Sequence, residues 1–172
     1  MRKDNTNRSL KGKKMVGLIV ARSRNNVIGK GGEIPWKIKG EQLQFKELTT
    51  GNVVVMGRHS YEEIGHPLPN RETIVVSRTK EFEGSGVRTA SSVKAAIDMA
   101  KGKNVYIAGG YGLYKEAIPL VDVMFITEVD IEIEDGDTYF PTFDEADFEM
   151  KTGETLGDEI QYTRTTYYRK NR

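Results

Sequence analysis

The sequence contains no cysteine and only two histidines, His59 and His66, among its 172 residues. Without cysteine the chain can form neither a disulfide nor a cysteine-ligated metal site, and two histidines are too few ligands for a histidine-based one. No apolar run is long enough to cross a membrane as a helix, and residues 1–14 lack the apolar region of a signal peptide. We therefore expect a cytoplasmic protein that holds no metal and does not enter a membrane.

Proline is also scarce, and no stretch rich in proline, glycine and serine divides the chain. A chain of this length can bury one sizeable core, so we expect a single domain at residues 15–172. Residues 1–14 carry six basic side chains and one acidic one, and we expect a basic, disordered tail there. Such a tail could bind nucleic acid or an anionic surface, but short basic tails are often inert, and we expect no nucleic-acid partner.

Short apolar runs bounded by polar residues recur along the chain, as is typical of strands buried on both faces. They occupy residues 16–21, 53–56, 73–77, 105–108 and 121–127. Helical patterns lie between them, and the clearest covers residues 91–101, where apolar residues follow Val93 at helical spacing between a serine cap and Gly102. This alternation predicts an α/β fold with a largely parallel sheet covered by helices.

The end of the chain changes to a two-residue alternation, which is the period of a strand. Residues 147–152 and 159–168 are predicted to form two strands joined through residues 153–158. We expect them to add an antiparallel hairpin to the sheet.

The segment 28–45 combines a glycine-rich loop with the only tryptophan, Trp36. Three glycines within residues 29–32 free the backbone and Pro35 then fixes its direction, which predicts a flap rather than a regular helix or strand.

An acid follows this flap. Glu41, Phe45 and Leu48 are spaced as one face of a helix, which would place a carboxylate among apolar side chains. An acid in such surroundings needs a hydrogen-bonded partner, and that partner could be a ligand. The alternative is a solvated glutamate in a first helical turn, where the helix dipole favours it.

Two of the predicted strands end in glycine turns that lead into helical patterns. Gly57 precedes Arg58 and His59 after one strand, and three glycines lie within residues 109–112 after another. In a parallel sheet both turns lie at the carboxyl ends of the strands, where α/β proteins bind cofactors and free N–H groups suit phosphate. The glycine spacing matches neither the dinucleotide fingerprint nor a P-loop, so each turn could also be an ordinary strand–helix connection.

Two arginines are further candidates for binding an anion. Arg71 follows a proline-stiffened stretch at residues 67–70, and a guanidinium held in this way suits a carboxylate. Arg78 directly follows a predicted strand and could meet a phosphate. Either could equally be an ordinary surface charge.

Taken together, residues 15–169 resemble the dihydrofolate reductase family. The resemblance rests on the order and spacing of motifs at residues 27–29 with 34–36, Glu41 with Phe45, and residues 56–60, 68–71, 108–110 with Tyr114, and 136–141. It implies a central sheet of eight mostly parallel strands, an antiparallel C-terminal hairpin and four flanking helices. It also implies NADPH as cofactor and hydride donor, reduction of 7,8-dihydrofolate to 5,6,7,8-tetrahydrofolate for one-carbon metabolism, and a monomer inhibited by diaminopyrimidine and pteridine antifolates.

The resemblance implies a role for each matching residue. Glu41 would be the acid of the pterin pocket, supported by Thr127, while Trp36 would close with the flap over the nicotinamide; these three are the expected catalytic residues. The expected substrate-binding residues are Ile19, Val20, Ile34, Glu41, Phe45, Ile64, Arg71, Ala108, Tyr114 and Thr127. The expected cofactor-binding residues are Ala21, Ile28, Gly29, Gly57, Arg58, His59, Ser60, Ser77, Arg78, Gly109, Gly110, Tyr111, Gly112, Leu113 and Tyr114. The family also implies a cis peptide between Gly109 and Gly110.

Three positions depart from the pattern best known from bacteria: Glu41 replaces an aspartate, Val20 an alanine, and Ala108 a larger aliphatic residue. The chemistry should survive, but one or two methylenes in such a pocket change binding by about 1–3 kcal/mol, which affects inhibitor preference.

Two other functions stay open, namely another pteridine or pyrimidine reductase on the same sheet and a nucleotide-binding protein without catalysis. The spacing of Trp36, Glu41 and Phe45 argues against the first, and the acid together with the paired glycines argues against the second.

Overall fold

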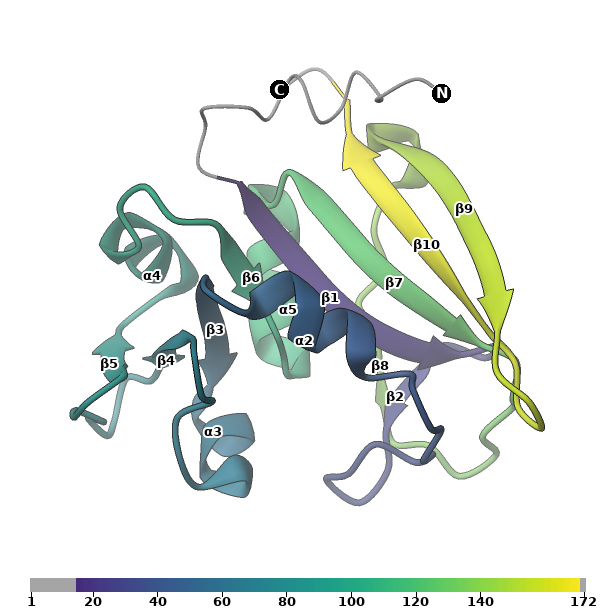
Figure 1. The fold of residues 1–172 in the computed structure, drawn as a ribbon, viewed down its shortest axis with the longest axis horizontal. Coiled ribbons are helices and arrows are strands. Elements are labelled where there is room, and N and C mark those ends of the chain that lie inside the picture. Colours follow the sequence, from purple (N-terminus) through teal and green to yellow (C-terminus); the bar gives the residue numbers. More distant parts are fainter. Residues whose placement is uncertain (1–14, 171–172) are drawn as a thin grey trace.

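The computed structural model describes residues 15–170, so the predicted tail at residues 1–14 lies outside the described residues. One sheet holds the strands in the order β5-β4-β3-β6-β1-β7-β10-β9 (Figure 1). These strands are β1 Val16–Ser23, β3 Val53–Gly57, β4 Glu72–Val76, β5 Val87–Ala90, β6 Val105–Ile107, β7 Val123–Val129, β9 Phe148–Leu156 and β10 Tyr162–Arg169. A smaller sheet pairs β2 Val27–Gly29 with β8 Thr138–Tyr139.

The main sheet is parallel from β5 to β7, and β10 and β9 then pair antiparallel. All five apolar runs of the sequence became central strands, because each can be buried on both faces. Val53, Val54, Val55, Ile74 and Ile107 have no exposed surface. The prediction of a largely parallel sheet with an antiparallel C-terminal hairpin is therefore confirmed.

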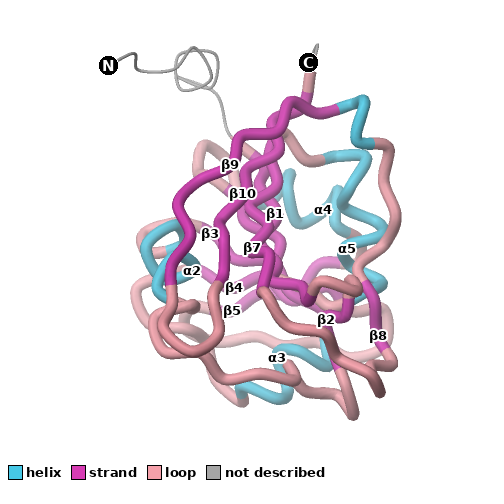
Figure 2. Tube along the Cα trace, turned by 90° about the vertical axis from the view of Figure 1, so that its right-hand side faces the viewer, coloured by secondary structure: helices cyan, strands magenta, loops and turns pink. Residues whose placement is uncertain are grey.

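Helices cover both faces of this sheet. They are α2 Leu43–Thr49, α3 Arg58–Ile64, α4 Val93–Met99 and α5 Tyr111–Ala117. Figure 2 shows α2 on one face and α4 with α5 on the other, while α3 lies at the edge where β3 ends. As predicted, α4 begins after a serine cap, with Ser92 Oγ accepting from the backbone N–H of Ala95 at 3.0 Å. Among the described residues, no helix is both long and apolar enough to span a membrane.

The predicted bounds of the hairpin were wrong at the turn. Strand β9 continues through Gly153 to Leu156, and the turn lies at residues 157–161. A Cβ on Gly153 would lie 2.7 Å from the backbone oxygen of Arg164, at the point where the register shifts between Thr163 and Thr165. Gly153 therefore marks a close backbone approach at an irregularity inside the strand, not the end of the strand.

Three short strands were missed in the sequence. Strand β5 has four residues with Arg88 exposed, and β2 and β8 have three and two. Such elements carry too few apolar positions for a periodic signal, and their existence depends on a neighbouring strand that supplies the hydrogen bonds. Gly29 also belongs to β2 rather than to the flap.

Candidate active site

Glu41 lies in a turn two residues before α2, so the prediction that it shares a helical face with Phe45 and Leu48 was wrong. Gly40 has a φ of 86°, a conformation that suits glycine, and the turn it makes delays the start of the helix. Glu41 is nevertheless half-buried, and its Oε1 accepts a hydrogen bond of 3.4 Å from the indole Nε1 of Trp36. The alternative of a solvated glutamate in a first helical turn does not fit this environment.

Burial raises the pKa of the Glu41 carboxyl above its ordinary value, while the Trp36 N–H and the positive charge of Arg164 lower it by a smaller amount. A carboxylate here carries a desolvation cost that nearby donors only partly offset. This is the electrostatic character of a group awaiting a ligand.

Arg164 lies next to the turn that carries Glu41, and it was not among the residues predicted from the sequence. It lies on β10 in register with Thr127 of β7, and its Nη2 donates to the backbone oxygen of Gly40 at 3.4 Å. The signal that could have found it is the two-residue period of β10, which places Arg164 on the same side of the strand as the buried Tyr162.

The predicted substrate residues of β1 and β7 lie on two adjacent strands of the main sheet. Ile19, Val20 and Thr127 are buried, and Thr127 is in register with Ala21 on β1 as well as with Arg164. Among the described residues, no hydrogen bond joins Thr127 to Glu41. The predicted support of the acid by Thr127 therefore stays a prediction.

The paired glycines form a tight junction between three strands. The peptide between Gly109 and Gly110 is cis, and the oxygen of Gly109 accepts from the N–H of Gly57 at 2.9 Å. The buried Tyr114 donates its hydroxyl to the oxygen of Ile19 at 2.9 Å, and its burial raises the pKa of that hydroxyl. A Cβ on Gly109 would lie 2.9 Å from the Tyr114 hydroxyl oxygen, so only glycine fits there.

Cations gather where β3 and β4 end. Arg58 and Lys80 both pair with Oε2 of Glu62, at 3.4 and 3.3 Å. Arg58 also donates to Oγ1 of Thr79 at 3.1 Å, and the largely exposed Arg78 lies 4.0 Å from Glu116. The structure thus brings the predicted Arg58 together with Lys80, which the sequence reasoning had not selected.

Arg71 is held as the proline-rich stretch predicted. Its Nε donates to the oxygen of Pro69 at 2.9 Å, and its Nη1 donates to Oγ1 of Thr49 at 3.1 Å. Partial desolvation lowers the pKa of its guanidinium. Within the described part of the chain both bonds leave Nη2 uncommitted, so Arg71 retains donors for a carboxylate.

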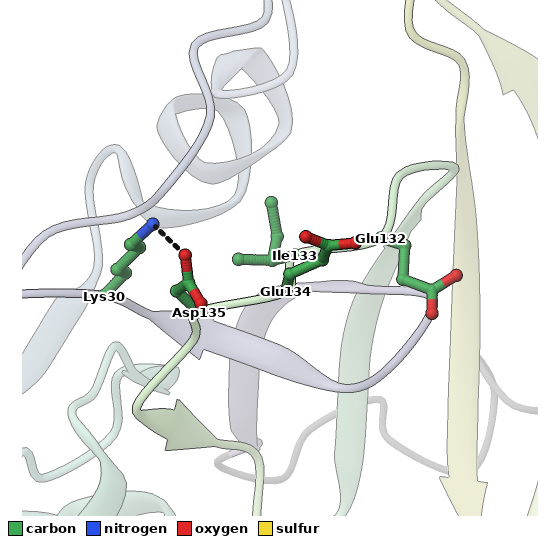
Figure 3. A pocket seen from close by; sticks show the side chains of 5 residues that line it. All are labelled: Lys30, Glu132, Ile133, Glu134 and Asp135. Atoms are coloured by element: carbon green, nitrogen blue, oxygen red, sulfur yellow. Dashed lines mark ion pairs between the residues drawn. The ribbon is translucent and has the colours of Figure 1, made fainter.

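The flap is tied to the loop before β8. The N–H of Gly31 donates to Oδ2 of Asp137 at 2.9 Å, and Lys30 lies 3.6 Å from Asp135 (Figure 3). The hollow beside this ion pair is lined by Lys30 and residues 132–135, three of which are acidic. Such a lining disfavours phosphate, so the hollow is not where an anionic cofactor would bind.

The remaining predicted residues differ in exposure. Trp36 is 7% exposed and packs with Val129 and Tyr162, whereas Ile34 is 56% exposed and Ile64, at the end of α3, is 38% exposed. Leu113 is buried; Ala21, Ile28, Gly29, Phe45, Gly57, Ser60, Ser77 and Ala108 are partly buried; and His59, Gly110, Tyr111 and Gly112 are exposed. Of the exposed apolar side chains, Ile34 lies two residues before Trp36, and Tyr111 directly follows the paired glycines.

A largely parallel sheet whose strands end in glycine turns, with cations on one side and a half-buried acid on the other, is the arrangement of an α/β enzyme that uses a nucleotide. Residues 15–172 match the family model described as dihydrofolate reductase. The chain is 42% identical over 156 residues to dihydrofolate reductase type A13 of Escherichia coli, covering 90% of this chain and 94% of that protein. It is 36% identical over 141 residues to dihydrofolate reductase of Bacillus subtilis (strain 168), covering 81% of this chain and 83% of that protein.

A solved structure agrees with these relatives. Dihydrofolate reductase from Enterococcus faecalis, complexed with NADP(H) and RAB-propyl, superposes with a TM-score of 0.80 at 34% identity, covering 91% of this chain and 97% of that one. This chain belongs to the dihydrofolate reductase family. The resemblance found in the sequence, and the eight-stranded sheet with four helices that it implied, are confirmed.

Proposed function

We propose that this protein reduces 7,8-dihydrofolate to 5,6,7,8-tetrahydrofolate with NADPH, and that Glu41 is the group that recognises the pterin. The observation that carries the proposal is the state of this acid. It is half-buried, and within the described part of the chain its one hydrogen bond uses Oε1, which leaves Oε2 and the second lone pair of Oε1 for the pterin amino group and the adjacent ring nitrogen.

The residues at the edge of the sheet fit NADPH. Nothing lies within 4 Å of a Cβ built on Gly112, so the backbone at this turn is open to close approach by a ligand. Arg58, Lys80 and Arg78 gather where β3 and β4 end, and such cations suit phosphates. When bound, NADPH supplies a hydride from C4 of its dihydronicotinamide, and C6 of dihydrofolate accepts it.

The protein's own part in the reaction is electrostatic and steric. Carbon C6 becomes electrophilic only when N5 is protonated, and an ionised Glu41 favours the protonated pterin. Because Glu41 would bind the opposite edge of the ring, it cannot reach N5, and water delivers that proton. The flap with Trp36 excludes bulk water and sets the distance between the rings.

The remaining contacts fix the rest of the substrate. Arg71 would hold the α-carboxylate of the substrate's glutamate, and Phe45 and Ile64 would enclose the pterin and benzoyl portions, with Ile34 nearest the nicotinamide. Diaminopyrimidine and pteridine antifolates would bind as cations against Glu41. We further propose that the protein works as a monomer in the cytoplasm, which size-exclusion chromatography with light scattering would test for the oligomeric state.

The test is loss of NADPH absorbance on adding dihydrofolate to purified protein. Glu41→Gln keeps the shape of the side chain but removes its charge, so the hydride step should slow on the order of a hundredfold at neutral pH and recover as the pH falls. NADPH affinity, measured by nucleotide fluorescence, should barely change because other residues provide it. Turnover of a pyrimidine substrate in place of dihydrofolate, or nucleotide binding without turnover, would favour the alternatives.

A further inference from the structure

Arg164 combines a buried, unpaired donor with a position next to the catalytic acid. Its Nε is buried and meets no hydrogen-bond acceptor among the described residues, while its Nη2 bonds to Gly40, the residue before Glu41. Its guanidinium carbon lies 5.7 Å from the centre of the Tyr162 ring. An unpaired buried cationic N–H is costly, so packing alone gives no reason to keep an arginine here.

The other charged residues near Glu41 do not have the same effect on its carboxylate. Lys37 and Lys39, on the approach to Glu41, are exposed, and Arg22 on β1 is bound to Glu128 of β7 at 2.9 Å. Trp36 on the flap and Thr127 on β7 are neutral. Arg164 on β10 is the positive group whose field lowers the pKa of the Glu41 carboxyl, although no ion pair joins the two side chains in the described structure.

We propose that Arg164 is a positioning residue for Glu41, which anchors the Gly40–Glu41 turn and keeps the carboxylate charged through space. The anchor is the hydrogen bond from Nη2 of Arg164 to the backbone oxygen of Gly40, and the Tyr162 ring packs beside the guanidinium. The charge acts at longer range, since a half-buried site screens it less than water would. This proposal depends on the proposed function in one respect: it assumes that the ligand bound by the charged Glu41 is the pterin.

Trp36 provides a readout that does not depend on activity. It is the only tryptophan, and its indole N–H donates to Glu41, so its fluorescence should follow the protonation of this acid. The experiment is a pH titration of tryptophan fluorescence in the ligand-free full chain. Glu41→Gln should remove the fluorescence transition, and its loss would identify the transition as the protonation of Glu41.

Arg164→Met keeps most of the side-chain length and removes the charge, so the midpoint should move to higher pH. Arg164→Lys restores a charge and should return the midpoint toward that of the unaltered protein. Lys39→Met is the matched control, because this exposed cation is two residues from Glu41 but screened by solvent, and it should leave the midpoint in place. If Arg164→Met does not fold, as judged by circular dichroism, Arg164→Gln replaces it.

An unchanged midpoint without the arginine charge would overturn the proposal, as would a shift that lysine fails to reverse. If the fluorescence midpoint does not move, the proposed dihydrofolate reduction can still be shown by the turnover assay. Conversely, a protein that does not turn over dihydrofolate could still show the shift of the midpoint. The two conclusions can therefore fail separately.

Discussion

At the scale of single residues, the candidate site holds an acid, Glu41, in surroundings that disfavour its charged form. Glu41 is half-buried with one hydrogen bond, from Trp36, within the described part of the chain. By contrast, Glu128 meets the Arg22 guanidinium through both carboxylate oxygens, at 3.0 and 2.9 Å. The paired acid supports the fold, while the poorly paired one fits the ligand-binding role that we propose for it.

This difference predicts a pH-dependent stability cost at Glu41. Burial raises its pKa above that of the unfolded chain, so the folded protein loses stability as the pH rises through the folded-state value and the group ionises. Glu41→Gln should therefore be more stable than the unaltered ligand-free protein at neutral pH, and the gain should vanish below the unfolded-state pKa. Urea unfolding of both proteins at several pH values measures this difference in the free energy of unfolding. Glu128→Gln is the contrast and should lose stability at neutral pH; a Glu41→Gln protein no more stable than the original would contradict the argument.

Arg58 and Arg78 are expected to set the preference for NADPH over NADH. Charged hydrogen bonds to the additional 2′-phosphate are worth about 1.5–3 kcal/mol each, and the exposure of Arg78 favours the lower end. Replacing both by alanine should narrow the ratio of kcat/KM values for the two cofactors by about a hundredfold. Arg24→Ala, which removes an exposed pair with Asp130, is the control and should leave the ratio unchanged. Equal use of both cofactors by the unaltered protein would refute the assignment.

At the scale of elements, the flap depends on a loop from another part of the chain. Asp137 accepts from the N–H of Gly31 and from the hydroxyl of Thr138, and these bonds hold the pKa of its carboxyl below the ordinary value. Asp137 therefore stays ionised at mildly acidic pH, and its hydrogen bond to Gly31 persists. Loss of this bond should not limit activity at such pH values.

Asp137→Ala should release the flap. We expect turnover to fall on the order of tenfold, because water exclusion and ring alignment depend on closure, while thermal stability changes little at this exposed position. Steady-state kinetics and thermal melts measure the two effects. Asp135→Ala removes only the longer pair with Lys30 and should behave like the unaltered protein. A loss of the same size in both variants would show that general charge, not the Gly31 bond, matters.

At the scale of the whole molecule, the site is assembled from segments far apart in the sequence. The sheet order places β1 between β6 and β7, so the glycine junction and the Glu41 region lie on either side of one central strand. Within the described residues, the strands and helices that build this arrangement lie between residues 16 and 169.

Residues 1–14 should accordingly be dispensable for the chemistry. The family match begins at residue 15 and the first described strand at Val16, so deleting residues 1–14 should leave turnover with dihydrofolate nearly unchanged. The measurement compares kcat and KM of the full and shortened chains. Circular dichroism checks that the shortened chain folds, and a large loss of activity in a folded protein would show that residues 1–14 belong to the site.

The sequence by itself determined the elements that local patterns specify. Apolar runs specified the central strands, the serine cap and helical spacing specified α4, and glycine turns marked the edge where a cofactor would bind. These features were predictable because burial and backbone freedom act over a few residues. The order and spacing of the motifs between residues 27 and 141 then indicated the family.

Only the tertiary structure decided the partners of these residues. Arg164 meets Gly40 across 124 positions, and Asp137 meets Gly31 across 106. It also decided that β9 passes through Gly153, because the close approach there is made by the partner strand. The physical reason is that strand register and loop packing set these contacts, and a one-residue slip in pairing would turn Arg164 to the other face without changing any local pattern.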